Sequence, residues 1–290
     1  MASWQEQASA FNQEQLLFSV SLCLCGCKTM NPKHFAPPRI SARFAQVWRR
    51  NFLVWRKLAV TSMLGNLADP MLYMLGLGYG LGGLLPQVDG IPYITFLAAG
   101  TVCYSTMNSA TFEALYSGFS RMHVQRTWDA IMNAPLNLDD IVLAETLWAA
   151  SKSFLSGIAI LIIIWALALS HSPLTLWIVP LTLLIGLTFG TLGLTMTALA
   201  PSYDFFLYYF TLVITPMVLL CGVFFPVTQL PPLLQQVSAV LPLTHAIDLV
   251  RPLVNGEIPQ RALLHLGVLV GYAAAGFYAA LVLTRRRLLQ

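Results

Sequence analysis

The stretch DIVLAETLWAASKSFLSGIAILIIIWALA, residues 140–168, is almost entirely apolar, and its only charged side chains are Asp140, Glu145 and Lys152. An α-helix needs about 20 predominantly apolar residues to cross the hydrocarbon core of a bilayer. This stretch is longer than that, and its charges lie in its first half. We therefore predict a transmembrane helix here, and the fold depends on how often the pattern recurs.

Five further stretches show the same pattern. They cover residues 58–84, 92–115, 174–199, 205–225 and 262–284. The whole chain is 57% hydrophobic and only 10% charged, whereas soluble domains carry about 25% charged residues. This composition excludes an ordinary soluble domain. The sequence predicts an all-α integral membrane protein whose six transmembrane helices occupy a domain at residues 58–287.

The placement of the basic residues predicts the orientation of these helices. Lysine and arginine near a span are retained on the cytoplasmic side of the membrane. Eight of the sixteen precede the first span, Arg121 and Arg126 lie between the second and third, and residues 285–287 follow the sixth. Only Arg251 and Arg261 would face outward. We therefore expect both termini in the cytoplasm.

Residues 30–57 are predicted to form a cytoplasmic N-terminus that ends in a helix lying in the membrane interface. In RFAQVWRRNFLVWRK, residues 43–57, aromatic residues recur every three or four positions and cations take most of the remaining face. Such a helix places its rings in the headgroup layer and its cations near anionic lipid. Nucleic acid is the competing interpretation, and it is rejected because a span follows at once. The residues that define this helix are Trp48, Arg49, Phe52 and Trp55.

Residues 1–29 are predicted to be a disordered leader, or one that is absent from the mature protein. The apolar stretch at 16–27 follows Glu6 and Glu14 rather than a positively charged region, so it does not fit a secretory signal. It is also too short to span the membrane. Its alternating cysteines fit no common zinc spacing, and Met30 offers a start of its own.

Four ionisable residues fall inside predicted spans, where charges are costly and usually have a partner or a function. They are Asp69, Glu113, Glu145 and Lys152. Glu145 and Lys152 share a helix face but lie about 10 Å apart along the axis, so a direct bond is not expected. We predict that Lys152 pairs with Asp69 or Glu113. A structural ion pair and a contact with substrate both remain open.

The first predicted span contains the glycine-rich stretch GLGYGLGG, residues 76–83. Gly76 and Gly80 are four residues apart, as are Gly78 and Gly82. This spacing lets another helix approach closely. A dimer seam is one interpretation, and internal packing or a bend near the outer surface is the favoured one.

Residues 224–261 connect the last two spans and contain too many prolines for a continuous helix. We predict two short, broken helices there, at about 232–241 and 244–255, which can enter the outer leaflet only if they pack against protein. His245, Asp248 and Arg251 lie three residues apart. This spacing is more typical of a surface salt bridge than of a metal site or a proton relay.

The chain lacks the sequence signatures of common hydrolases and of ATP-binding proteins. It contains no GxSxG and no HExxH, and no glycine is followed by lysine, which excludes a Walker A loop. No catalytic, metal-binding or cofactor-binding residue is therefore predicted. If the protein uses ATP, another subunit binds it.

The stretch YSGFSRMHVQRTWDAIMNAPLNLDD, residues 116–140, places polar residues between the second and third spans. Phe119, Met122 and Trp128 keep roughly helical spacing, and Arg121 and Arg126 take other faces. We predict a short amphipathic helix on the cytoplasmic side. It could lie on lipid. The alternative is a handle for a partner protein, with the apolar side chains as a knob and the arginines as a polar rim.

Four stretches of the chain resemble the type-2 permease family of ABC exporters. They are LGNLADPMLYMLGLGYGLG (64–82), FEALYSGFSRMHVQRTWDAIMNAPL (112–136), DIVLAETLWAASKSFLSG (140–157) and LPLTHAIDLVRPLVNG (241–256). Within the family, the chain resembles the nodulation protein J branch, which exports lipo-oligosaccharide together with an ATPase subunit. The resemblance covers about residues 40–290 and leaves the leader out.

This resemblance implies a homodimeric permease in the bacterial inner membrane, with two cytoplasmic ATPase subunits that bind ATP and magnesium. In the family, the connection after the second span forms a coupling helix that docks on the ATPase. On this sequence that role falls on residues 119–128, and the interfacial helix would complete the contact surface. The coupling residues implied are Phe119, Arg121, Met122, His123, Arg126 and Trp128.

An amphipathic glycolipid or lipo-oligosaccharide would move outward along the seam between two copies of the chain, where we expect the first and fifth spans. The tyrosines expected to contact sugar there are Tyr73, Tyr79, Tyr208 and Tyr209. One alternative is an ion-coupled carrier that uses Asp69 and Glu145 as ion sites. Another is a lipid-modifying enzyme with Glu113 or Glu145 as a general base near Lys152.

Overall fold

The computed structural model describes residues 32–85, 87–88, 90–170 and 172–289. The chain divides into two compact units, Met1–Pro37 and Pro38–Gln290. In the first unit, the described residues include one short 3₁₀ helix, η2 (Pro32–Phe35). The predicted leader and its cysteines lie outside the described residues. The second unit contains the predicted spans.

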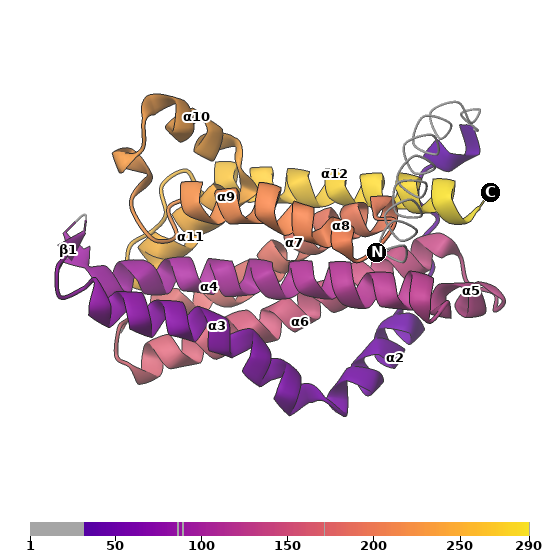
Figure 1. The fold of residues 1–290 in the computed structure, drawn as a ribbon, viewed down its shortest axis with the longest axis horizontal. Helices are drawn as coiled ribbons and strands as arrows, with labels where there is room; N and C mark the ends of the chain where they lie inside the picture. The colour runs from indigo at the N-terminus through magenta and orange to yellow at the C-terminus, as the bar shows by residue number, and fades with distance from the viewer. Residues whose placement is uncertain (1–31, 86, 89, 171, 290) are drawn as a thin grey trace, which may run out of the picture. The chain divides into compact units, whose positions relative to one another are not determined.

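The second unit is a bundle of helices (Figure 1). In chain order, the α-helices are α2 (Phe44–Arg56), α3 (Ala59–Gly80), α4 (Tyr93–Phe112), α5 (Thr127–Met132), α6 (Leu138–Ala166), α7 (Ile178–Leu199), α8 (Asp204–Tyr209), α9 (Thr215–Leu220), α10 (Pro232–Val240), α11 (Pro242–Asn255) and α12 (Ala262–Leu288). The predicted helical class is confirmed. A small antiparallel hairpin of β1 (Gln87–Val88) and β2 (Ile91–Pro92), which the sequence did not predict, joins α3 to α4.

Several turns depart from α-helical geometry. The 3₁₀ turns are η5 (Pro173–Trp177) and η7 (Val227–Gln229), and the π-helical turns are η3 (Glu113–Ser117), η4 (Ser120–Val124) and η6 (Phe210–Ile214). A π turn holds one residue more than an α turn and is frequent at functional sites. Two of them extend α4 and the third joins α8 to α9. Both composite helices therefore change register part-way along.

Three helices of the described chain are long and apolar enough to cross a membrane, at Leu138–Ala166, Pro173–Leu199 and Ala262–Leu288. The pair α10 and α11 passes the same test together, but it bends by 87° at its junction and is a broken span or a re-entrant loop. Six spans are therefore not confirmed by the structure. The polar Asn66 and Asp69 lower the hydropathy of α3.

Helix α4 is less apolar than a lipid-facing span because most of it is buried inside the bundle. Several of its hydroxyl groups form hydrogen bonds within the protein, although the buried Thr111 Oγ1 has no partner among the described residues. Thr101 and Thr106 donate hydrogen bonds to carbonyl oxygens four residues earlier, and Ser105 Oγ lies 2.8 Å from Ser156 Oγ of α6. A helix in this position is not selected for contact with hydrocarbon, and its mean hydropathy understates how deeply it is buried.

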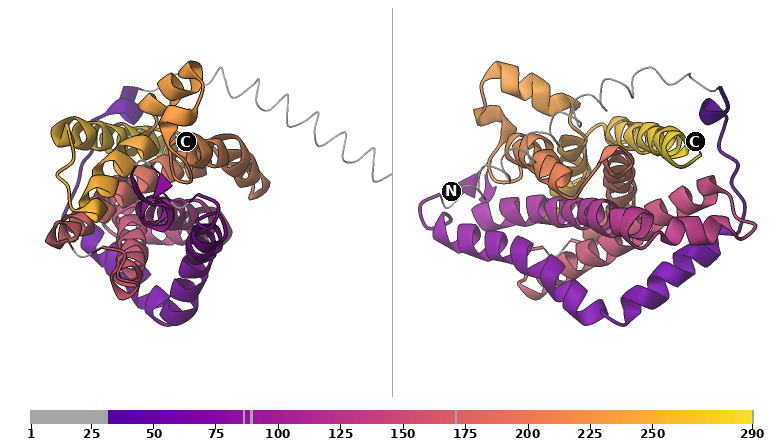
Figure 2. Two further views of the ribbon diagram at one scale, coloured as in Figure 1. Left: turned by 90° about the vertical axis from the view of Figure 1, so that its left-hand side faces the viewer. Right: turned by 45° about the vertical axis from the view of Figure 1, so that its right-hand side comes forward.

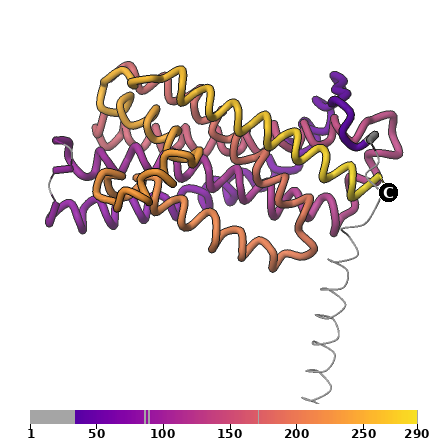
Figure 3. The backbone as a smooth tube through the Cα atoms, turned by 90° about the horizontal axis from the view of Figure 1, so that it is seen from above, coloured from indigo at the N-terminus to yellow at the C-terminus, as the bar shows by residue number. Residues whose placement is uncertain are grey.

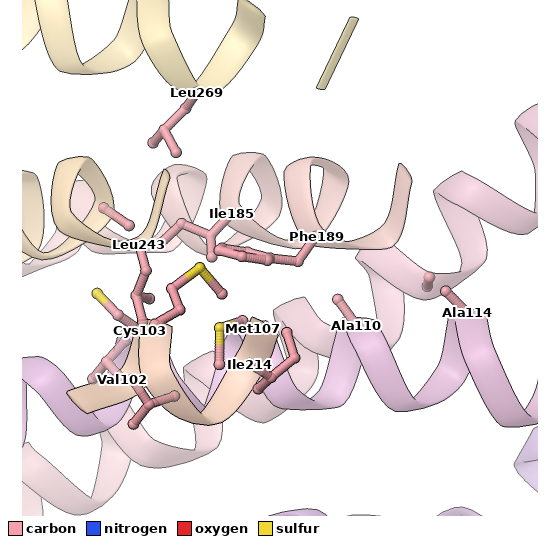
Figure 4. Packing of buried hydrophobic residues seen from close by; sticks show 14 of the residues in the cluster. Val102, Cys103, Met107, Ala110, Ala114, Ile185, Phe189, Ile214, Leu243 and Leu269 are labelled. Carbon is pink, nitrogen blue, oxygen red and sulfur yellow. The ribbon is translucent and has the colours of Figure 1, made fainter. Parts of the chain in front are cut away.

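The hydrophobic core lies where α4, α6 and α7 meet, and α11 and α12 close it. Figure 4 shows Met107 of α4 beside Ile185 and Phe189 of α7, with Leu243 of α11 and Leu269 of α12 completing the cluster. All five side chains are buried. This core fixes the relative positions of the long helices.

Glycine residues allow these helices to approach closely. A Cβ added to Gly157 of α6 would lie 2.6 Å from Thr182 Cγ2 of α7, and one added to Gly193 of α7 would lie 2.7 Å from Ala114 Cβ. Small residues at helix contacts are the usual basis of close packing in membranes. These positions therefore hold α7 against both α6 and the extension of α4.

The two predicted broken helices are present as α10 and α11. The chain turns by 87° between them at Leu241, which has an extended backbone ahead of Pro242. Helix α11 is buried along most of its length and packs on α4 and α12. The condition that such pieces must rest on protein is therefore met by α11.

Helices α2 and α3 meet at a sharp corner (Figures 1 and 2), where Leu58 has a non-helical backbone. The hairpin, α10 and α11 gather at one end of the bundle, and α5 lies at the other (Figure 1). We call the latter the α5 end. Figure 3 shows α12 running along the bundle toward the α5 end. Helix α5 and the C-terminal end of α12, which are distant in sequence, therefore both lie at the α5 end.

Candidate functional site

Four charged side chains form one cluster near the α5 end. Glu113 begins the π turn η3, Arg121 lies in η4, and Glu145 and Lys152 lie on α6. Lys152 Nζ is 2.8 Å from Glu113 Oε2, and Arg121 Nη2 is 3.0 Å from Glu113 Oε1 and 2.6 Å from Glu145 Oε2. Two cations and two carboxylates thus alternate and sum to zero charge.

The predicted pairing of Lys152 with Asp69 or Glu113 is confirmed for Glu113. Glu145 and Lys152 do not rely on each other, as their axial separation predicted. Instead, Arg121 and Glu113 connect them from the α4 side. Of the predicted intramembrane charges, Glu113, Glu145 and Lys152 therefore lie together. Asp69 lies apart from them and accepts a hydrogen bond from Tyr104.

The two π turns explain how Arg121 reaches Glu113. In a regular α-helix, residues eight apart are displaced by about 80° around the axis. The turns η3 and η4 occupy this interval and shift the register. Arg121 Nη2 then donates to Glu113 while Nε donates to Glu145 Oε1 at 3.0 Å. This guanidinium therefore binds both carboxylates at once.

The carboxylates also accept hydrogen bonds from uncharged donors. Trp148 Nε1 donates to Glu113 Oε1 at 2.8 Å, Ser117 Oγ donates to Glu113 Oε2 at 3.0 Å, and Asn51 Nδ2 of α2 donates to Glu145 Oε1 at 3.2 Å. Buried charges are tolerated when they are paired and hydrogen-bonded. The cluster therefore joins α2, α4 and α6 into one unit.

Arg121 lies in the connection between predicted spans, and its pKa is raised from the ordinary arginine value. Burial alone would lower this pKa, but the negative charges of Glu145 and Glu113 more than offset it. The guanidinium is therefore a permanent cation. The carboxylates face a fixed positive charge rather than a titrating one.

The aromatic residues of α2 pack on α6. Trp48, Phe52 and Trp55 surround the ring of Trp148, with centroid distances of 6.3, 6.4 and 5.9 Å. Trp48 Nε1 also donates a hydrogen bond to Ser151 Oγ at 3.1 Å. These rings, predicted to lie in the headgroup layer, are partly buried and contact protein as well. Arg49, on the same helix, is exposed.

The predicted coupling residues divide into buried and exposed groups. Phe119, Met122 and Trp128 are only 4%, 2% and 1% exposed. They belong to the core and present no apolar knob to solvent, which corrects that interpretation. Arg121 is held in the charge cluster. Of the six, only Arg126 is exposed.

The exposed tip of the α4–α6 connection begins at Val124, which is 64% exposed, and continues through Gln125 and Arg126. Arg126 has a left-handed backbone with φ of 48°, which is uncommon outside glycine and asparagine. This residue turns the chain from η4 into α5. Asp129, three residues later, is also exposed.

His123 lies beside this tip and is half-buried. Its ring centroid is 4.6 Å from that of Phe119. Burial lowers the pKa of His123, and the positive charge of Arg287 lowers it further. The imidazole is therefore held in its neutral form over more of the acidic range than a free histidine.

A lateral cavity of about 720 Å³ lies between α3, α4 and the helix built from η6 and α9. One wall is polar and carries Asn66, Asp69, Tyr104 and Asn108. The facing wall is apolar, with residues such as Phe210, Ile214 and Val218. The cavity is therefore amphipathic across its width.

Asp69 is exposed within the polar wall. Tyr104 OH donates a hydrogen bond to Asp69 Oδ2 at 2.8 Å, and the ring of Tyr73 packs edge-on against that of Tyr104. An intramembrane carboxylate is tolerated where it faces a polar cavity. Tyr104 was not predicted from the sequence, because a lone tyrosine in an apolar stretch carries no distinguishing pattern.

The four tyrosines predicted to contact sugar do not lie together. Tyr73 lines the lateral cavity, whereas Tyr79, Tyr208 and Tyr209 are not among its lining residues. Tyr79 and Tyr208 are 68% and 63% exposed, and Tyr209 is buried. One of the four therefore occupies a place from which it could contact a bound solute.

The glycine pairs of α3 also divide. A Cβ on Gly78 would lie 3.0 Å from the side chain of Ile94, so this glycine supports internal packing. A Cβ on Gly76 or Gly80 would meet nothing within 4 Å. The two interpretations of this stretch thus apply to different faces of the helix.

A second buried ion pair was not predicted from the sequence. Arg285 of α12 donates to both carboxylate oxygens of Asp139 at the start of α6, at 2.9 and 2.5 Å. The neighbouring Asp140 accepts from the backbone N–H and the hydroxyl of Ser41 at 2.7 and 2.8 Å. Two adjacent aspartates in the first turn of a helix were the available signal.

The residues His245, Asp248 and Arg251 have partners that their spacing did not predict. His245 Nδ1 lies 2.8 Å from His265 Nδ1 of α12, and His265 Nδ1 lies 3.9 Å from Asp248 Oδ2. The guanidinium of Arg251 stacks over Phe96. The described residues contain no group of three or more ligands suited to a metal ion.

Residues 42–254, which include the whole charge cluster and the lateral cavity, match the family model described as ABC-2 type transporter. The chain belongs to this family. Members of the ABC-2 family are membrane components of transporters that work with an ABC ATPase. The chain is thus a transport component.

Individual relatives agree with this assignment. Nodulation protein J of Bradyrhizobium diazoefficiens is 48% identical over 87% of this chain and 97% of its own length. Nodulation protein J of Rhizobium leguminosarum bv. viciae is 49% identical over 84% and 94%. The inner membrane transport permease YadH of Escherichia coli is 24% identical over 70% and 78%. The predicted resemblance is confirmed.

Proposed function

We propose that this chain is the membrane-spanning permease of an ATP-driven exporter that moves an amphipathic glycolipid or lipo-oligosaccharide outward across a bacterial inner membrane. The observation that carries the proposal is the exposed tip at Val124–Arg126, which is joined through buried ion pairs to the long helices of an ABC-2 transporter. The full arrangement has six spans, both termini in the cytoplasm, and two copies of the chain.

The coupling step follows from this connectivity. A cytoplasmic ATPase subunit binds the exposed tip around Arg126, and the interfacial helix α2 contributes to the same interface. Force on the tip acts on Arg121, whose guanidinium is bonded to Glu113 at the end of α4 and to Glu145 on α6. Because Asn51 of α2 also contacts Glu145, all three helices move together. ATP and magnesium are bound by the two ATPase subunits.

The solute path uses the lateral cavity. Its polar wall, with Asp69 and Tyr104, suits hydroxyl-rich sugar, and its apolar wall along η6 and α9 suits an acyl chain. The open glycines Gly76 and Gly80 let α3 of a second copy approach. The cavity then becomes part of the seam between two permeases, as the first and fifth spans would require.

The side-chain contacts favour this proposal over the two alternatives. An ion-coupled carrier that uses Asp69 and Glu145 needs both carboxylates to bind and release an ion, yet Glu145 is held by Arg121. A general base beside Lys152 needs a carboxylate without a permanent cation, yet Glu113 contacts both Lys152 and Arg121. Neither residue is available for the role that the alternative assigns to it.

The test is ATP-dependent transport by the assembled complex. Inverted membrane vesicles that contain this permease and its ATPase subunit should accumulate a radiolabelled acylated oligosaccharide when ATP is added. A variant ATPase that lacks its Walker A lysine is the control and should abolish uptake. Uptake that survives ATP depletion would overturn the proposal and favour ion coupling.

A further inference from the structure

A second cavity, of about 540 Å³, lies beside the charge cluster and is distinct from the lateral cavity. It opens between α2, the start of α3, the end of α4 and α6. Its polar lining includes Arg50, Arg121 and Lys152, and its apolar lining includes Val54, Trp55 and Leu58. Because three cations line this cavity, the positive and negative charges around it indicate which kind of ligand it can bind.

The charges around this cavity do not balance. Glu113 and Glu145 are matched by Arg121 and Lys152, so that this tetrad is neutral. Arg50 on α2 adds a further cation, and Glu145 and Arg121 are close enough to act on it electrostatically. Glu145, however, is already bonded to Arg121. The group therefore carries one uncompensated positive charge.

Hydrogen bonding leaves Arg50 unsatisfied as well. Its Nη1 is buried and has no hydrogen-bond partner in the described part of the chain. Trp55 Nε1, on the same cavity wall, is buried and without a partner in the same way. Buried polar groups normally have partners, and the exceptions need an explanation. Two such groups at one cavity indicate a site that can bind a ligand.

The chemistry of these groups defines the ligand. A guanidinium and an indole N–H can only donate hydrogen bonds, so the ligand must supply acceptor oxygens. One excess positive charge requires one negative charge. A phosphate monoanion meets both conditions, and arginine is a preferred partner for phosphate. Free phosphate and the phosphodiester of a lipid headgroup share this chemistry.

The cavity edge favours the lipid. Val54 and Leu58 line it and are 58% and 66% exposed, and Leu53 beside them is 46% exposed. Exposed apolar side chains next to a phosphate-binding group suit a ligand with acyl chains. Helix α2 is amphipathic, as expected of a helix that lies at a membrane surface.

We propose that this cavity, between α2 and the Glu113–Arg121–Glu145–Lys152 cluster, binds the phosphate of an acidic phospholipid headgroup through Arg50. The bound lipid ties α2 to α4 and α6, because the cavity is lined by all three. It neutralises the excess charge and leaves the lateral cavity free. This inference does not depend on which solute the protein exports.

The test uses the purified full-length protein in detergent. Its thermal unfolding midpoint is measured on titration with phosphatidylglycerol, with phosphatidylcholine of the same acyl chains, and with inorganic phosphate. Phosphatidylglycerol should raise the midpoint more than phosphatidylcholine does. In Arg50→Gln, the apparent affinity for phosphatidylglycerol should fall about tenfold or more, as for loss of a charged hydrogen bond.

Two variants keep the test decisive. Arg56→Gln removes an exposed cation from the same helix outside the cavity, and it should bind phosphatidylglycerol as the parent protein does. Arg50→Lys keeps the charge and should retain part of the affinity even if Arg50→Gln is poorly stable. A midpoint shift of equal size with inorganic phosphate would identify a free anion as the source.

The proposal is overturned by either of two results. One is an equal response to phosphatidylglycerol in the parent protein, Arg50→Gln and Arg56→Gln, which would mean that general surface charge attracts the lipid. The other is no preference for phosphatidylglycerol over phosphatidylcholine in the parent protein. Transport assays are not involved, so failure here is separate from failure of the export proposal.

Discussion

Lys152 Nζ lies 2.8 Å from Glu113 Oε2, which joins the middle of α6 to the π turn at the end of α4. Both side chains are largely buried, at 15% and 4% exposure. The pair is one edge of the charge cluster, whose other edges run through Arg121. Its contribution to stability and to coupling can be separated by mutation.

Lys152→Met should destabilise the protein, because Glu113 loses one of its two cations while remaining buried. Removing one partner of a buried ion pair costs about 3–5 kcal/mol, and a value near the lower end is expected because Arg121 still contacts Glu113. Thermal unfolding in detergent measures the change. The double variant Lys152→Met/Glu113→Gln should recover part of the loss, and additive losses would contradict the pairing.

The sequence was sufficient to predict the helical class and to limit the expected partner of Lys152 to Asp69 or Glu113, of which the structure has Glu113. Charges in apolar stretches are few, so each has few possible partners. The contacts of Arg121 could not be predicted from the sequence, because they depend on the π turns η3 and η4, which shift the helical register. No regular periodicity encodes such a shift.

The burial of Trp128 could not be predicted from the sequence either. The roughly helical spacing of Phe119, Met122 and Trp128 predicts a helix, but it does not show what covers these side chains. In the structure all three belong to the main core. The contact between the aromatic side chains of α2 and Trp148 of α6 could not be predicted for the same reason.

Asp69→Asn should lower transport about tenfold or more without changing the amount of protein in the membrane. Sugar hydroxyls can donate hydrogen bonds to the Asp69 carboxylate, and hydrogen bonds to charged groups contribute about 1.5–3 kcal/mol. Initial rates of ATP-dependent uptake give the comparison. Thr61→Val, an exposed change on the same helix, is the control, and equal rates in both variants would remove Asp69 from the solute path.

Gly80→Leu should weaken the association of two copies of the chain, because a leucine there would occupy the space that α3 of the second copy needs. Light scattering of the detergent-solubilised protein measures the change as a shift from dimer toward monomer. Gly267→Leu is a matched control, because a Cβ at Gly267 of α12 also meets nothing within 4 Å. A dimer lost only in Gly267→Leu would place the seam on α12.

Acidification should destabilise the parent protein more than His123→Gln. The pKa of His123 is lowered in the folded state, first by burial and then by Arg287, whereas the unfolded state keeps an ordinary value of about 6.5. As pH falls through that value, the unfolded chain binds the proton first, and the folded state loses stability. Parallel midpoint-versus-pH curves for the two proteins would contradict this account.

The position of Arg126 tests the central claim most directly. A single cysteine placed at this residue, in a chain with its native cysteines replaced, can be joined to the ATPase subunit by a short cross-linker in intact membranes. We expect cross-links to the ATPase, and labelling by a membrane-impermeant maleimide only from the cytoplasmic face. Labelling from the outer face, without any cross-link to the ATPase, would contradict the account.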